Sequence, residues 1–289
     1  MRWGLRLLLG ISMAGTVATC AGLAASWSRV QKVERSNELV AEAQGLGAEG
    51  RWREAFELAQ TAAGMAPENP YARRELAMHH IARGEAKAAV RELRTAADAA
   101  PDDAGLAMEL GAALQAAGDS EGAIEVLRRA ASMDPGNGVI LALLSGCLLE
   151  AGRLEAGLEV AEKAVALAPR IQSAQFNLGL ARWRSGEPEE ALQAFAEAMR
   201  LRPSDVSAMI CTSAVMGEMG RSEEALGYAR RAAATAPRNA NAWAALGGAL
   251  MRTGRRAEAV AAFARALEID PEHPVARRQA GGLRREGTR

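Results

Sequence analysis

Glycine and proline recur in this sequence at a fixed interval of 34 residues, and no other feature limits the possible folds as strongly. The glycines of the series are Gly50, Gly84, Gly118, Gly152, Gly186, Gly220 and Gly254. The prolines are Pro67, Pro101, Pro135, Pro169, Pro203, Pro237 and Pro271. An alanine series from Ala62 to Ala266 keeps the same interval without a break. The chain is therefore predicted to consist of seven similar units.

The recurring glycines and alanines predict a helix pair in each unit. Each glycine follows a helical run, so we expect it to take the left-handed conformation that ends the first helix. The alanines lie at helical spacing on the second helix, where a small side chain lets two helices approach closely. Because one helix pair cannot bury its apolar face alone, the units are predicted to stack into a solenoid.

The recurring prolines predict the end of each second helix and the start of the next unit. A residue suited to cap a helix N-terminus stands two positions after five of them: Asn69, Asp103, Asn137, Asp205 and Asn239. Ile171 and His273 break this capping pattern.

The repeat resembles the tetratricopeptide repeat over residues 36–273. The family motif is plainest in Trp243, Leu246, Gly247, Leu250, Gly254, Ala259, Phe263, Ala266 and Pro271. Thr212 and Ser213 replace the usual Leu and Gly of the sixth unit, and Arg182 takes a normally apolar place in the fifth. The resemblance implies an all-α, right-handed superhelical solenoid whose concave groove binds protein partners.

The predicted organisation has three parts. Residues 1–35 form an N-terminal signal-anchor or transmembrane segment with a linker. The seven units follow at 36–69, 70–103, 104–137, 138–171, 172–205, 206–239 and 240–273. Residues 274–289 resemble the family's C-terminal capping helix and tail, in which Gly281 and Gly282 are expected to end or weaken the helix.

Residues 7–28 contain no charged side chain and are followed by Arg29, Lys32 and Arg35. A spanning helix needs about 20 apolar residues, whereas the core of a cleaved signal needs only about 7 to 15, so the length favours an uncleaved membrane anchor. Trp3 and Trp27 stand where interfacial aromatic residues would lie. We expect the N-terminus inside and the repeats exported, in a periplasmic or other extracytoplasmic location.

Two other fates of this segment stay open at the level of sequence. A secreted protein would follow from cleavage near Ala21 or Ala25. A lipoprotein would follow from lipidation of Cys20, because residues 17–20 resemble a lipobox, although Thr19 fits poorly before the cysteine.

Composition and motifs favour no enzyme, cofactor or metal site. Lys plus Arg and Asp plus Glu both number 35, so no net field favours a nucleic acid partner. The three cysteines form no CxxC pair. The GxGxxG string at residues 45–50 lacks the strand that a dinucleotide site needs, and the adjacent His79 and His80 point about 100° apart on a helix. No nucleophile with a base is found.

The groove side of each first helix supplies the candidate partner-binding residues. If positions in a unit are numbered 1 to 34, places 4, 7, 8 and 11 face the second helix and places 2, 5, 9 and 12 lie about 150° away. The resemblance implies that this opposite side and its rim line the groove. The residues selected there are Arg74, Met108, Leu149, Phe176, Asn177, Leu180, Trp183, Arg184 and Ile210.

The alternative is that these side chains only contact the next first helix in the stack. For Phe176, Leu180 and Trp183 the groove interpretation is preferred, because three large apolar residues on one outward face are costly to leave in water. Asn177 takes the place at which family members often hydrogen-bond a peptide backbone.

The sequence thus predicts a membrane-anchored, non-catalytic protein–protein interaction scaffold that binds a partner peptide or helix in its groove. The alternatives are a lipoprotein or secreted assembly factor, and an accessory subunit of an envelope enzyme complex.

Overall fold

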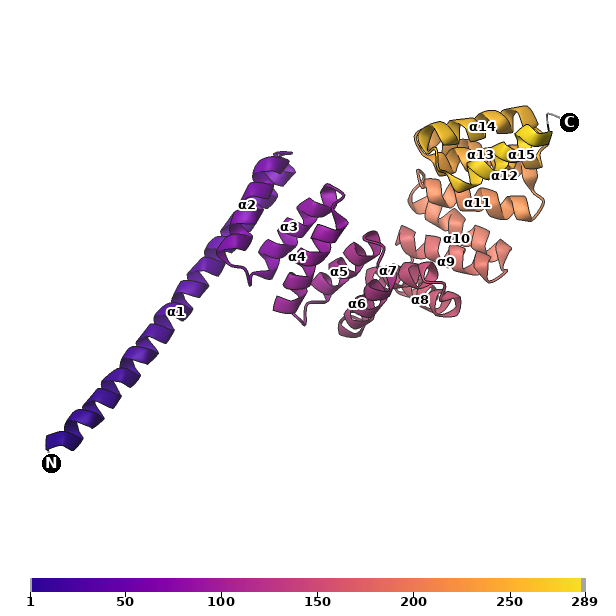
Figure 1. Ribbon diagram of the computed structural model, residues 1–289. Coiled ribbons are helices and arrows are strands. Elements are labelled where there is room, and N and C mark those ends of the chain that lie inside the picture. The colour runs from indigo at the N-terminus through magenta and orange to yellow at the C-terminus, as the bar shows by residue number, and fades with distance from the viewer. Residues whose placement is uncertain (1, 287–289) are drawn as a thin grey trace. The chain divides into compact units, whose positions relative to one another are not determined.

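The computed structural model describes the backbone of residues 2–286 and the side chains of residues 25–280, and within this part the chain is entirely helical (Figure 1). The fold class is confirmed: fifteen helices and no strand occur in the described backbone. They group into two compact units, Met1–Met133 and Asp134–Arg289, and each unit is its own stack of helix hairpins.

The first unit contains three hairpins. Its helices are α1 (Arg2–Ala48), α2 (Trp52–Met65), α3 (Pro70–Ala82), α4 (Ala86–Ala99), α5 (Ala104–Ala116) and α6 (Ser120–Met133). Helix α1 runs without a break through position 36, where the first repeat was predicted to begin. Packing does begin there, because Ser36 is fully buried and its hydroxyl donates to the Ala62 carbonyl at 2.9 Å.

The second unit contains four hairpins and a final single helix. Its helices are α7 (Gly138–Glu150), α8 (Leu154–Leu167), α9 (Gln172–Arg184), α10 (Pro188–Leu201), α11 (Val206–Glu218), α12 (Ser222–Thr235), α13 (Ala240–Arg252), α14 (Arg256–Ile269) and α15 (Pro274–Glu286). Each odd-numbered helix contacts the next odd-numbered one. The first helices and α15 therefore form one continuous row in this unit.

The glycine series ends the first helices as predicted. All seven glycines have φ between 73° and 84°, the left-handed region in which a Cβ atom would be strained. At Gly84 the glycine N–H donates to the Ile81 carbonyl, and the following Glu85 N–H donates to the His80 carbonyl, both at 2.9 Å. This hydrogen-bond pair is the Schellman motif, which satisfies carbonyls that the helix end leaves open.

Small residues let the two helices of each hairpin touch. The alanines from Ala62 to Ala266 are all fully buried. On the facing helix, a Cβ atom on Gly179 would lie 2.7 Å from the ring of Phe195, so the glycine makes room for that ring. Gly247 gives Phe263 the same space, with a distance of 2.6 Å.

The predicted caps form, and one expectation about them is wrong. The side chain of Asn69 accepts from the N–H of Tyr71 at 3.1 Å, and Asp103, Asn137, Asp205 and Asn239 act in the same way. Ile171 provides no side-chain cap. His273 does cap α15, because its ring Nδ1 accepts from the N–H of Ala276 at 3.2 Å.

The glycine pair near the C-terminus does not end the last helix. Helix α15 continues through Gly281 and Gly282 to Glu286. A helical glycine costs only about 1 kcal/mol relative to alanine, and a helix ends at one only when the backbone turns left-handed.

The departures from the family motif are absorbed locally. The buried Ser213 hydroxyl donates to the Ala225 carbonyl at 2.8 Å, while the buried Thr212 hydroxyl has no hydrogen-bond partner among the described residues. Arg182 is half-buried and reaches Glu162 at 3.3 Å.

Most of the predicted anchor lies outside the described side chains. The described side chains begin at residue 25, so those of Trp3 and Cys20 are not among them. In the searched part of the chain, which is the described residues alone, no helix is long and apolar enough to cross a membrane.

Replacing Ala198 by Leu tests the small-residue contact. Ala198 is fully buried on α10, so the added atoms should overpack the hairpin and cost about 1 to 3 kcal/mol of unfolding free energy, measured by urea denaturation. Ala196→Leu on the exposed face of the same helix is the control. Equal stability of the two variants would contradict the assigned packing.

Candidate functional site

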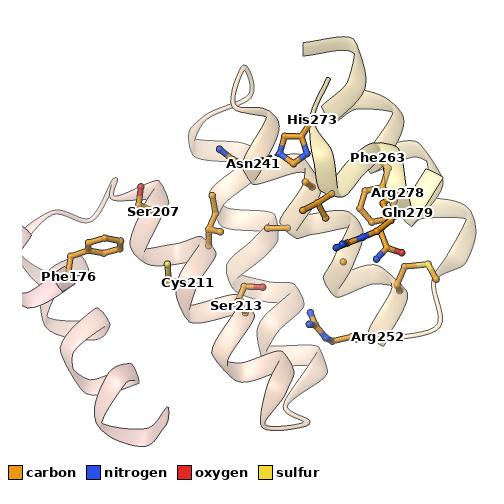
Figure 2. Close-up of a pocket in the computed structure, with 17 residues that line it drawn as sticks. Phe176, Ser207, Cys211, Ser213, Asn241, Arg252, Phe263, His273, Arg278 and Gln279 are labelled. Carbon is orange, nitrogen blue, oxygen red and sulfur yellow. Dashed lines mark hydrogen bonds between the residues drawn. The ribbon is translucent and has the colours of Figure 1, made fainter. Parts of the chain in front are cut away.

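A pocket of about 730 Å³ opens on the first-helix side of the second unit (Figure 2). Its floor is α11 and α13, Phe176 of α9 and Phe263 of α14 extend it, and α15 forms one wall. In units six and seven the floor residues follow the groove places 2, 5, 9 and 12: Ser207, Ile210, Ala214, Asn241, Ala244, Gly248 and Met251. The row of first helices therefore supplies the floor.

The pocket is hollow because its floor carries small side chains. Ala214, Ala244 and Ala245 add only a methyl group each, and a Cβ atom on Gly248 would meet nothing within 4 Å. The larger apolar groups, Ile210 and Met251, are half-buried and leave an apolar surface between them. A surface of this kind suits apolar side chains of a ligand.

Two arginines supply the charge of the pocket. Arg252 comes from the end of α13, and Arg278 projects from α15 (Figure 2). The Arg252 guanidinium lies over Gly217 of α11, where a Cβ atom would be 2.9 Å from its Cζ. The lining, all of it within the described part of the chain, includes no carboxylate.

His273 fixes the wall of the pocket. Its Nδ1 accepts the Ala276 N–H, so Nε2 carries the ring proton and donates to the Asn241 side-chain oxygen at 2.9 Å. The buried ring thereby joins the start of α15 to the start of α13. The position of Arg278 follows from this junction.

Cys211 lines the pocket as an unreactive thiol. Burial and, to a smaller extent, the Asp205 carboxylate raise its pKa to about 11, against a lowering effect of Arg184. With this pKa, Cys211 is protonated at neutral pH. The protonated thiol is a poor nucleophile, because the thiolate is the reactive form.

Of the residues predicted to bind a partner, Phe176 and Ile210 line this pocket. The Phe176 ring also packs on Phe195, with centroids 5.7 Å apart. Leu180 and Trp183 pack against the buried cluster of Ala191, Phe195 and Val215, and the indole N–H of Trp183 donates to Glu218 at 2.7 Å. The apolar stripe of α9 is thus partly used in the contacts of α9 with α10 and α11.

The polar residues predicted on α9 bond to α7. Asn177 donates to the Ala142 carbonyl at 2.8 Å and to the Ser145 hydroxyl at 3.1 Å. Arg184 donates to the Leu149 carbonyl at 2.7 Å. Their hydrogen-bonding groups join neighbouring repeats.

The assignment of Leu149 to the groove surface is corrected by the structure. Leu149 is only 1% exposed. A Cβ atom on Gly157 would lie 2.7 Å from its side chain, so Leu149 fills the space inside its own hairpin.

Arg74 and Met108 belong to the first unit, and the pocket is described within the second. Arg74 forms a forked ion pair with Glu109, at distances from 2.6 to 2.8 Å. Met108 is half-buried.

Sequence reasoning missed Asn241, Gly248, Arg278 and His273 as pocket residues. The same groove places, applied to the seventh unit, select Asn241, Ala244, Gly248 and Met251, all of which line the pocket. When the numbering continues into α15, they also select Val275 and Arg278. The signal was therefore present in the repeat itself.

Family models described as tetratricopeptide repeat match residues 47–112, 114–182, 172–205 and 217–274. The chain belongs to the tetratricopeptide repeat family. Proteins of this family generally bind protein partners and act as non-catalytic scaffolds. No curated protein sequence matches the chain.

Solved structures show the same fold at low sequence identity. A tetratricopeptide repeat protein from Parabacteroides merdae is 14% identical, with a TM-score of 0.70 over 88% of this chain and 99% of that one. The pilF protein of Pseudomonas aeruginosa is 21% identical, with a TM-score of 0.61 over 74% and 97%. The APC/C hetero-tetramer Cut9-Hcn1 contains a chain that is 13% identical, with a TM-score of 0.74 over 83% of this chain and 48%, about half, of that one.

Substitutions of His273 test whether its ring holds α15 in place as the wall of the pocket. His273→Asn keeps a capping acceptor, whereas His273→Ala removes a cap worth about 1 kcal/mol together with the bond to Asn241. Amide hydrogen exchange in α15 should be faster in the alanine variant than in the asparagine variant. Equal protection in both variants would show that the ring does not hold the helix.

Proposed function

We propose that this chain is a non-catalytic scaffold that binds a segment of a partner protein in the pocket on α11, α13 and α15. The observation that carries the proposal is an apolar floor made of groove places, with polar groups at its edge. A volume of about 730 Å³ can hold several side chains of a bound segment.

The edge of the pocket has hydrogen-bonding groups that suit a peptide. Asn241 uses its side-chain oxygen to accept from His273, which leaves the amide N–H groups for a ligand carbonyl. Ser207 and Gln279 also line the pocket, and both are exposed. A few polar groups around an apolar floor give a bound segment its orientation.

Attachment to a membrane through residues 7–28 is part of the same proposal. The uncharged segment precedes Arg29 and Lys32, and the exposed Trp27 stands at their border. Helix α1 continues from this segment into the first repeat, so the repeats would follow the anchor without a flexible linker. A lipoprotein attached through Cys20 and a secreted form are the competing attachments, and an accessory subunit of an envelope enzyme would use the same pocket.

Filling the pocket from its floor tests partner binding. Gly248→Leu places a large side chain in open space, and the helix gains up to about 1 kcal/mol in propensity, so the protein should stay folded. Random peptides displayed on phage are selected on the full chain, and the affinities of the selected peptides are measured. They should bind Gly248→Leu at least tenfold more weakly.

Gly227→Leu is the matched control, because Gly227 is exposed on α12, outside the pocket lining, and also has open space around its Cβ position. Full affinity for Gly227→Leu is expected. Peptides that bind wild type and Gly248→Leu equally would place binding elsewhere and overturn the proposal.

The anchor predicts two properties of the full chain in cells. The protein should resist carbonate extraction, and a reporter fused after Arg289 should be active only outside the cytoplasm. A mature protein that begins between positions 22 and 28 would exclude the anchor, and labelling of Cys20 by palmitate would identify a lipoprotein.

A further inference from the structure

We infer that the partner segment is acidic: an apolar side chain enters the pocket while carboxylates on either side of it bind Arg252 and Arg278. This inference rests on the proposed function, because it specifies the chemistry of the segment bound at the same site. Its evidence is the charge of the pocket lining, which contains two arginines and no carboxylate. The proposed function rests instead on the apolar floor.

Arg252 extends along the floor but has no acceptor beneath it. It occupies place 13 of the seventh unit, and Arg184 occupies the same place in the fifth. Arg184 reaches back to the preceding first helix of its stack and donates to the Leu149 carbonyl at 2.7 Å. Arg252 reaches back to Gly217, but no hydrogen bond to α11 joins it there among the described residues.

Arg278 adds a second positive charge from the wall that α15 forms. It lies on α15, which the bonds of His273 to Asn241 and to Ala276 hold in place. In Figure 2 its side chain projects from α15 toward the floor helices. Within the described side chains, residues 25–280, Arg278 forms no ion pair.

Several other arginines of the second unit are paired with a glutamate, whereas the two in the pocket lining have no carboxylate beside them there. Arg200 pairs with Glu197 at 2.6 Å, Arg221 with Glu224 at 2.6 Å, and Arg265 with Glu268 at 2.5 Å. Because the chain as a whole has zero net charge, the excess at the pocket is local.

Two cations beside an apolar floor favour an anionic ligand. Both guanidinium groups are exposed, so an anionic ligand can reach them, and their attraction for it is weakened by salt. A guanidinium can bind a carboxylate through two parallel hydrogen bonds, and such bonds are about twice as strong as neutral ones. Asp and Glu side chains are the groups in a protein segment that provide this acceptor.

Peptide selection with charge-neutral variants tests this chemistry. Peptides displayed on phage and selected on the wild-type full chain should be enriched in Asp and Glu around an apolar residue. Arg252→Gln and Arg278→Gln should each weaken the selected peptides about tenfold, and added salt should weaken binding to wild type more than to the double variant. Arg265→Gln on α14 removes a paired arginine outside the pocket and should leave affinity unchanged.

Gly217→Ala gives a test that keeps the charge. The added methyl group would displace the Arg252 guanidinium, while alanine improves the propensity of α11. Weaker binding of the acidic peptides at undiminished thermal stability is expected. A role of Arg252 in folding alone would leave affinity unaltered.

The outcomes separate this inference from the proposed function. Selected peptides that lack acidic residues, or that keep their affinity for the double variant, overturn the acidic partner if Gly248→Leu still blocks them. Failure to select any peptide, or binding that Gly248→Leu does not reduce, overturns both.

Discussion

The close approach of two helices at a small residue is the contact on which every hairpin depends. The alanines at 34-residue intervals are fully buried, and the glycines that face Phe195 and Phe263 leave room for no side chain of their own. A larger residue at such a contact would separate the helices and forfeit dispersion contacts along the interface. The left-handed glycine at the turn then fixes the direction in which the second helix returns.

This hairpin geometry also determines where ligands can bind. The second helix of each hairpin packs on its first helix. The first helices of the second unit contact one another in a row, and α15 is the last helix of that row. Residues on neighbouring first helices meet about one repeat apart in sequence. Arg184 contacts Leu149, Trp183 contacts Glu218 and Asn177 contacts Ala142, each at a separation of 35 residues.

The sequence predicted the fold because its signals are local. The helix ends follow from glycines and caps, and the groove face follows from helical spacing, which selects Ile210 correctly and would have selected Gly248. The contacts of Asn177 and Arg184 depend on how neighbouring repeats are aligned, which a single helix does not encode.

His273 was missed because histidine is rarely a cap, and its second bond depends on Asn241, 32 residues earlier. The continuous α1 reflects the lack of any Gly or Pro between residues 23 and 44 to end a helix.

The same spacing explains why Arg252 has no acceptor on the neighbouring first helix. Inside the stack a polar side chain on one first helix can find an acceptor on the preceding one, as Arg184 of α9 does on α7. Arg252 finds Gly217 at that separation, which has no side-chain acceptor. Arg278 stands on α15, which no further first helix follows in the described chain. An acidic segment bound on α13 and α15 would therefore supply the acceptors that Arg252 and Arg278 lack among the pocket residues, as Leu149 does for Arg184 within the stack.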